Sequence, residues 1–172
     1  MTSMDTISAL PRETLERMLE DFAKNWLAHD GLWFQAVEKQ CGMEIAIRLD
    51  TDAWRQFTVI EAQRIMALHN IPANSGLAGL KKALGFRLYA LLNKQEIRNE
   101  SDSAFEFVMV DCRVQSARQR KSLPLFPCKS VGLVEYEWFA KTVDPRIKTD
   151  CLCCPPDPQA GTGHFCAWRF SI

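Results

Sequence analysis

The spacing of apolar residues changes about halfway along the chain, and this change limits the fold more than any other feature. From Pro11 to Leu92, apolar residues recur every three or four positions, which is typical of helices that bury one face. Beyond Asn93, aromatic and β-branched residues at alternate positions predict strands. Helices first and a sheet later favour a single α+β domain over residues 1–172, with N-terminal helices packed on a C-terminal antiparallel sheet.

The pattern predicts five helices and four strands. The first helix begins at Pro11, which fits a first helical turn, and runs to Gly42 with room for a bend at 29–31. Residues 1–10 are expected to be a loose N-terminal tail. The other helices are predicted at 43–48, from Asp50 or Thr51 to the loop at 70–75, at 76–92 and at 131–142. The strands are predicted at 95–99, 104–115, 146–152 and 165–172.

The charge balance excludes some classes of partner. The chain has 21 basic and 21 acidic side chains, so it offers no electrostatic reason to bind nucleic acid or an anionic membrane surface. The first ten residues lack the basic start and apolar run of a secretory signal, and no apolar stretch is long enough to span a bilayer. We therefore expect a cytoplasmic protein.

Cysteine is abundant for a protein of a reducing compartment, where dense cysteine indicates metal or thiol chemistry more often than disulfides. Most of these residues fall in the C-terminal third, where three lie within four positions of one another. The seven cysteines are Cys41, Cys112, Cys128, Cys151, Cys153, Cys154 and Cys166.

The spacing of the C-terminal cysteines suits a metal ion. Cys151 and Cys154 form a C-x-x-C pair that can place two sulfurs on one ion, and the loop from Pro155 to Gly163 can return Cys166 to the same point. Cys128 lies just before the helix predicted at 131–142. Two other interpretations stay open for these residues: buried structural thiols, or a redox or disulfide switch.

Short motifs around these cysteines resemble the 4-vinyl reductase domain superfamily, which includes sensor domains of bacterial aromatic-responsive regulators. The motifs are Phe126-Pro127-Cys128-Lys129, Gly132 with Tyr136, Cys151-x-x-Cys154, and Gly163-His-Phe-Cys166-Ala-Trp168. The resemblance implies a site with the ligands Cys128, Cys151, Cys154 and Cys166, where Cys151 replaces the glutamate of the sensors. It implies zinc in preference to iron. Cys153, Cys112 and His164 are the next candidates for metal ligands.

The chain as a whole is similar to a family of uncharacterised archaeal and bacterial cytosolic proteins. The similarity is carried by the segment from Trp26 to Phe34, with Trp-x-x-His-Asp-Gly-x-Trp-Phe, and by Cys-Pro-Pro-Asp at residues 154–157. A neighbouring family is named for L-2-amino-thiazoline-4-carboxylic acid hydrolase. This similarity implies no function that can be transferred to the chain.

A second candidate site lies on the first helix. Trp26, His29, Asp30 and Trp33 follow helical spacing and so share one face. A His–Asp pair between two tryptophans can line a pocket for an organic ligand. The alternative is a core stripe in which the two polar residues bond to neighbouring backbone.

Together these features predict a zinc-binding domain that binds or senses a small organic ligand, with no nucleic-acid or membrane partner. An enzyme is the alternative: a metal- or cysteine-dependent hydrolase that acts on a small C–N or C–S substrate, with Cys112 as a candidate nucleophile. A protein-interaction subunit, such as a homodimer, is the third class.

Overall fold

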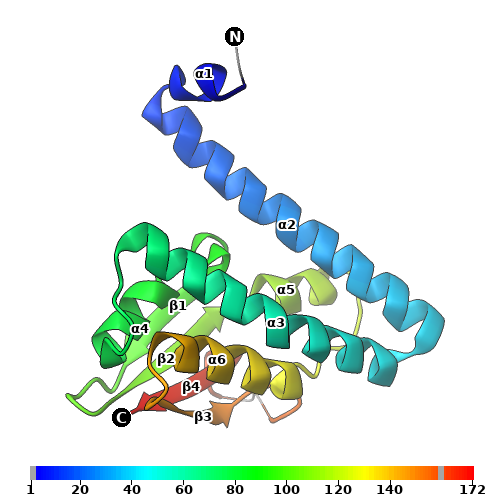
Figure 1. The fold of residues 1–172 in the computed structure, drawn as a ribbon. Coiled ribbons are helices and arrows are strands. Elements are labelled where there is room, and N and C mark those ends of the chain that lie inside the picture. Colours follow the sequence, from blue (N-terminus) through cyan, green and yellow to red (C-terminus); the bar gives the residue numbers. More distant parts are fainter. Residues whose placement is uncertain (1–2, 159–160) are drawn as a thin grey trace.

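The computed structural model of the chain describes residues 3–158 and 161–172 (Figure 1). It confirms an α+β fold in which N-terminal helices pack on a C-terminal antiparallel sheet. The elements in chain order are α1 (Ser3–Ser8), α2 (Arg12–Cys41), α3 (Met43–His69), α4 (Gly76–Leu84), the 3-10 helix η1 (Leu88–Leu91), β1 (Lys94–Arg98), β2 (Ala104–Asp111), α5 (Arg113–Arg120), α6 (Lys129–Val143), β3 (Lys148–Cys153) and β4 (Cys166–Ser171).

Two long helices dominate the first half of the chain. The bend expected at 29–31 is absent, because α2 continues unbroken to Cys41. Gly42 separates the two helices with a φ of 86°, a left-handed conformation that favours glycine. α3 begins directly after it, so the prediction of a separate helix at 43–48 and a cap at Asp50 or Thr51 was wrong. α3 packs along α6, while the N-terminal part of α2 extends past the body with α1 (Figure 1).

Part of the expected N-terminal tail is helical. Ser3–Ser8 form α1, whose described side chains are exposed. None of the helices in the described ranges is both long enough and apolar enough to cross a membrane.

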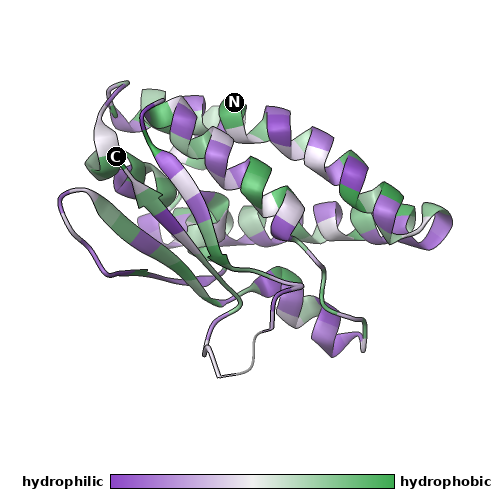
Figure 2. Cartoon of the chain, turned by 90° about the horizontal axis from the view of Figure 1, so that it is seen from below, coloured by the Kyte–Doolittle hydropathy of each residue, from purple (hydrophilic) through white to green (hydrophobic). Residues whose placement is uncertain are grey.

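The sheet has the strand order β1-β2-β4-β3, and every neighbouring pair is antiparallel. The helices gather on one side of it, as the view from below shows (Figure 2). Alternate residues of β2 and β4 face them and form the main core, with Phe105 opposite Phe170 and Phe107 opposite Trp168. The same inward row ends with Met109 opposite Cys166, and there the core meets a cavity.

Gly132 brings α6 close to this row. A Cβ atom at that position would lie 2.7 Å from the Trp168 indole, so only glycine lets the helix lie on the ring. The pair β3–β4 carries a bulge between Cys151 and Cys153. Cys151 lies opposite Trp168 and Cys153 lies opposite Ala167, so β3 has one extra residue at this point.

Two segment predictions in the middle of the chain were also wrong. The helix expected at 76–92 ends at Leu84 and is followed by η1. The strand expected at 104–115 ends at Asp111, because Asn93 Oδ1 accepts a hydrogen bond from the Arg113 amide at 2.9 Å and the chain turns into α5.

Candidate functional site: a cavity with a cysteine floor

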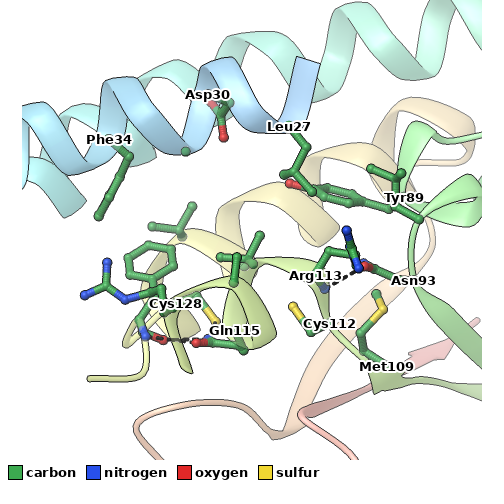
Figure 3. A pocket seen from close by; sticks show the side chains of 18 of the residues that line it. Leu27, Asp30, Phe34, Tyr89, Asn93, Met109, Cys112, Arg113, Gln115 and Cys128 are labelled. Atoms are coloured by element: carbon green, nitrogen blue, oxygen red, sulfur yellow. Dashed lines mark hydrogen bonds between the residues drawn. The ribbon is translucent and has the colours of Figure 1, made fainter. Parts of the chain in front are cut away.

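A cavity of about 280 Å³ lies where the helices meet the end of the sheet. One wall comes from α2 and α3, the sides come from η1 and α5, and the floor comes from α6 and the ends of β2 and β4. Leu27, Asp30 and Phe34 point from α2 into this space, toward Cys112 and Cys128 on the opposite side (Figure 3). The cavity therefore collects side chains that lie far apart in the sequence.

Four cysteines gather at the floor of the cavity. The Sγ atoms of Cys128 and Cys154 lie 3.5 Å apart. The sulfurs of Cys151 and Cys166 also lie within hydrogen-bonding reach of the Cys154 thiol. Cys128, Cys154 and Cys166 line the cavity, and Cys151 lies behind them on β3. These are the same four residues that the sequence motifs single out as metal ligands.

Hydrogen bonds between the thiols shift their pKa values in opposite directions. The bond with Cys154 lowers the pKa of Cys128, although burial acts against it. The Cys154 thiol lowers the pKa of Cys151 in the same way, and Lys129 adds to the effect. The pKa of Cys154 itself is raised strongly by its bonds to Cys128, Cys151 and Cys166. One thiol thus donates to neighbours that gain thiolate character, the form that binds metals.

Other polar groups hold these sulfurs in place. Gln115 Nε2 donates to the Cys128 sulfur at 3.4 Å, and Trp168 Nε1 donates to the Cys166 sulfur at 3.3 Å. Cys128 also lies at the N-terminus of α6, where the helix dipole favours a thiolate. Donors of this kind around a thiolate orient it and stabilise its charge.

The loop after Cys154 is tied to the start of α6. Asp157 Oδ2 accepts a hydrogen bond from the Cys154 amide at 3.1 Å, and the same carboxylate pairs with Lys129 Nζ at 2.9 Å. The Lys129 amide donates to the Pro155 carbonyl at 2.9 Å. These bonds fix Cys154 against the helix that begins after Cys128.

One sulfur–sulfur distance at the floor of the cavity is close to the value expected for two thiolates on the same zinc ion. Within the described residues, no group of three or more His, Cys, Asp or Glu side chains is placed so that it could hold a metal ion. Two sulfurs on one zinc ion, each at 2.3 Å with a tetrahedral angle, lie about 3.8 Å apart. The Cys128–Cys154 separation of 3.5 Å differs from this by only a few tenths of an ångström.

The three reserve candidates for metal ligands lie elsewhere or serve other contacts. Cys153 is on the far side of the bulge, with its thiol directed to the Pro158 carbonyl at 3.9 Å. The His164 ring bonds to the Thr162 carbonyl at 2.8 Å. Cys112 lies at the start of α5 and lines the cavity. Burial raises the pKa of the Cys112 thiol to about 12, so this group is not an activated nucleophile.

The four residues predicted to line a ligand pocket do lie together, but not in the cavity above the cysteines. All four border a separate depression on α2, and Asp30 also lines the cavity. Trp26 stacks on Phe57 with ring centroids 5.5 Å apart, whereas the Trp33 side chain is 68% exposed. The structure thus brings only one of the four to the cavity.

Several residues of the cavity were missed in the sequence. Asp50, Tyr89, Glu135 and Tyr136 all line it. Asp50 follows a helix-capping pattern, which hid its place in the middle of α3. Glu135 interrupts the apolar face of α6, and that interruption is the one signal in the sequence that could have identified it.

A buried ion network supports the wall behind the cavity. Arg87, which is 2% exposed, lies 2.8 Å from Glu61 and 2.7 Å from Glu135. These two carboxylates raise the pKa of Arg87 although burial opposes them. Burial raises the pKa of Glu135, and Arg87 offsets only part of that effect.

Comparison with known proteins identifies a family for the chain, but that family has no known activity. No curated protein matches the chain. A family model matches residues 8–172, which is nearly the whole chain, and the chain therefore belongs to DUF6125, a family of unknown function.

Proposed function

We propose that the chain is a zinc-binding domain that binds or senses a small organic molecule, with Cys128, Cys151, Cys154 and Cys166 as the zinc ligands. The observation that carries this proposal is the position of the cysteine cluster. Its sulfurs converge on Cys154, and three of them form the floor of the cavity. The resemblance to 4-vinyl reductase domains suggests the same four residues from the sequence.

The surroundings of the sulfurs support a metal in preference to buried thiols. Four thiolates around Zn²⁺ carry a net negative charge, which needs donors nearby. The side chains of Gln115 and Trp168 supply N–H groups to two of the sulfurs, and Lys129 lies close enough to favour a thiolate at Cys151. Zinc in this place would join β3, β4 and α6, so its binding would add directly to folding stability.

The hydrolase alternative has less support. A cysteine nucleophile needs a lowered pKa and a positioned base, whereas the pKa of Cys112 is raised to about 12. Four cysteine ligands would also leave no open position for a water molecule on the metal.

Metal analysis tests the zinc half of the proposal. Protein purified without added metal is assayed for zinc and iron, together with serine variants at each of the four cysteines. We expect about one zinc per wild-type chain and a large loss in all four variants, since structural zinc sites have four protein ligands. Cys41→Ser, at the exposed end of α2, is the matched control and should keep the metal. Metal retained in two or more of the four variants would contradict the assignment.

Cavity-filling variants test the ligand half. Small amines, alcohols and acids with an aromatic body are screened by thermal shift against the wild type and against Ala117→Trp, which places a large ring in the cavity. Ala78→Trp, on the exposed side of α4, is the control. Stabilisation by a compound should disappear in the first variant and persist in the second. Equal responses from both variants would show that the compound binds elsewhere.

A further inference from the structure

Two carboxylates face the cavity from different helices and lack a basic partner. Asp30 comes from α2 and Asp50 from α3, and both are half-buried in the cavity wall. Figure 3 shows the Asp30 carboxylate pointing away from its helix and into the cavity. Across residues 3–158 and 161–172, no ion pair involves either of them. The Trp54 indole lies within hydrogen-bonding reach of Asp50.

Among the described residues, three acidic side chains line the cavity, and the charges of two of them act on the third. Glu135 on α6 also faces it, but Arg87 already pairs with Glu135 and Glu61. Burial is the main cause that raises the pKa of Asp50 to about 7, and the nearby charges of Asp30 and Glu135 raise it further. Burial also raises the pKa of Asp30, with only the neighbouring His29 acting against it. A positive group between these carboxylates would relieve their repulsion.

Two tyrosine hydroxyls supply a second, independent indication of a ligand. Tyr89 and Tyr136 line the cavity and are only 8% and 5% exposed. In the described part of the chain neither hydroxyl has a hydrogen-bond partner, and neither oxygen is among the fully buried unpaired atoms, so both remain accessible to a molecule in the cavity. The Tyr89 ring also stacks on Trp54 with centroids 6.0 Å apart, so an aromatic wall stands beside Asp50. Aromatic faces and hydroxyl oxygens both attract organic cations.

The basic residues that line the cavity in the described part of the chain are either ion-paired or exposed. Arg118 is occupied by Glu38 at 2.7 Å and by the Pro124 carbonyl. Lys24 pairs with Asp21 and Glu20 on its own helix. Arg113 and Arg120 are exposed on α5. Within the described residues, an anionic ligand would therefore find bases without an ion pair only in the exposed side chains of Arg113 and Arg120.

We propose that the cavity binds a small organic cation, an amine or amidine on an apolar body, with its charged end between Asp30 and Asp50 and its body beside Tyr89, Tyr136 and the cysteine floor. This inference rests on the proposed function, which has a small molecule enter the cavity. It is independent of the zinc site, because the charged end of the ligand is held by carboxylates and not by sulfurs.

Three matched probes test the charge preference: phenethylamine, phenethyl alcohol and 3-phenylpropionate, titrated into the full chain by isothermal calorimetry. We expect the amine to bind at least tenfold more tightly than the other two. Because the bound cation keeps Asp50 ionised, amine affinity should rise about tenfold between about pH 6 and pH 8, with proton release on binding. Equal or tighter binding of the alcohol or the acid would overturn the inference.

Amide variants test the two carboxylates. Asp30→Asn and Asp50→Asn should each weaken amine binding about tenfold or more, and Asp50→Asn should also abolish the pH dependence. Asp52→Asn, exposed two residues along α3, is the control and should bind like the wild type. Unchanged amine affinity in both cavity variants overturns the cation site while leaving small-molecule binding intact. If none of the three probes binds, the inference is also overturned, and the thermal-shift screen then decides whether the proposed function falls with it.

Discussion

Replacing Asp50 by asparagine should stabilise the protein at alkaline pH. The pKa of this carboxyl is about 7 in the folded chain, against 3.8 when it is unperturbed, with burial as the largest cause. Between those values the folded chain holds a proton that the unfolded chain has released. The free energy of unfolding therefore falls as the pH rises from about 4 to 7, and the loss is complete above pH 7. Asparagine has the same shape and does not titrate.

The size of the effect follows from the shift. A difference of roughly three pKa units corresponds to about 4 kcal/mol. Asp50 is half-buried and reaches solvent through the cavity, so we expect about 2–4 kcal/mol at pH 8. For a chain of this size that gain amounts to a rise of about 5–15 °C in melting temperature. At pH 4 the difference should be small, because the folded aspartate is then protonated and the unfolded one, with a pKa of 3.8, is about half protonated.

Urea unfolding at a series of pH values between about 4 and 8 measures this difference directly. The wild type should lose stability relative to Asp50→Asn as the pH rises, and Asp52→Asn should follow the wild type because its side chain is exposed. Parallel curves for the wild type and Asp50→Asn, or a less stable Asp50→Asn at pH 8, would refute the argument that an ionised Asp50 is a cost to the fold.

Three further changes have definite expected outcomes. Arg87→Met leaves two buried glutamates without their cation and should lower the free energy of unfolding by about 3–5 kcal/mol in urea titrations; a loss below about 1 kcal/mol would contradict the buried network. Gly132→Ala should cost about 1–3 kcal/mol by the same assay because the added methyl group meets Trp168, whereas Gly85→Ala, with only ordinary contacts, should stay within about 1 kcal/mol of the wild type. Complete metal removal with a chelator should lower the melting temperature of the wild type strongly, and an unchanged melting curve would count against a structural zinc.

The sequence predicted those parts of the fold that repeat a simple spacing. The inward row of β2 follows from Phe105, Phe107 and Met109 at alternate positions. The convergence of the cysteines was predictable because Cys151 and Cys154 share a short segment and a strand pair returns Cys166 beside them. Local patterns of this kind depend on neighbours in the chain or on one partner strand.

The rest depended on contacts between distant elements, which no local pattern encodes. Arg118 belongs to a run of basic residues that would suit a solvated turn, yet it is 3% exposed and makes two bonds to Glu38, eighty positions earlier. Asp50 has the sequence context of a helix cap, but it lies inside α3, which continues past it and packs on α6. Arg87 could be placed only with knowledge of both α3 and α6. Tertiary packing decides such positions, whatever the local propensity.

The cavity lies on the boundary between two apolar clusters, and this position explains why carboxylates and thiols line it. The main cluster joins the sheet, α4 and α6 and includes Cys154 and Cys166, while a second cluster around Trp54 and Phe126 attaches α2 to the body. Cys128 packs against both clusters. At such a boundary, side chains from two separately packed units meet without interdigitating fully, so carboxylates and thiols can be buried there without breaking either core. The helical and alternating patterns of the sequence predict each cluster, but neither pattern predicts the boundary between them. Ligand sites are commonly found at such boundaries.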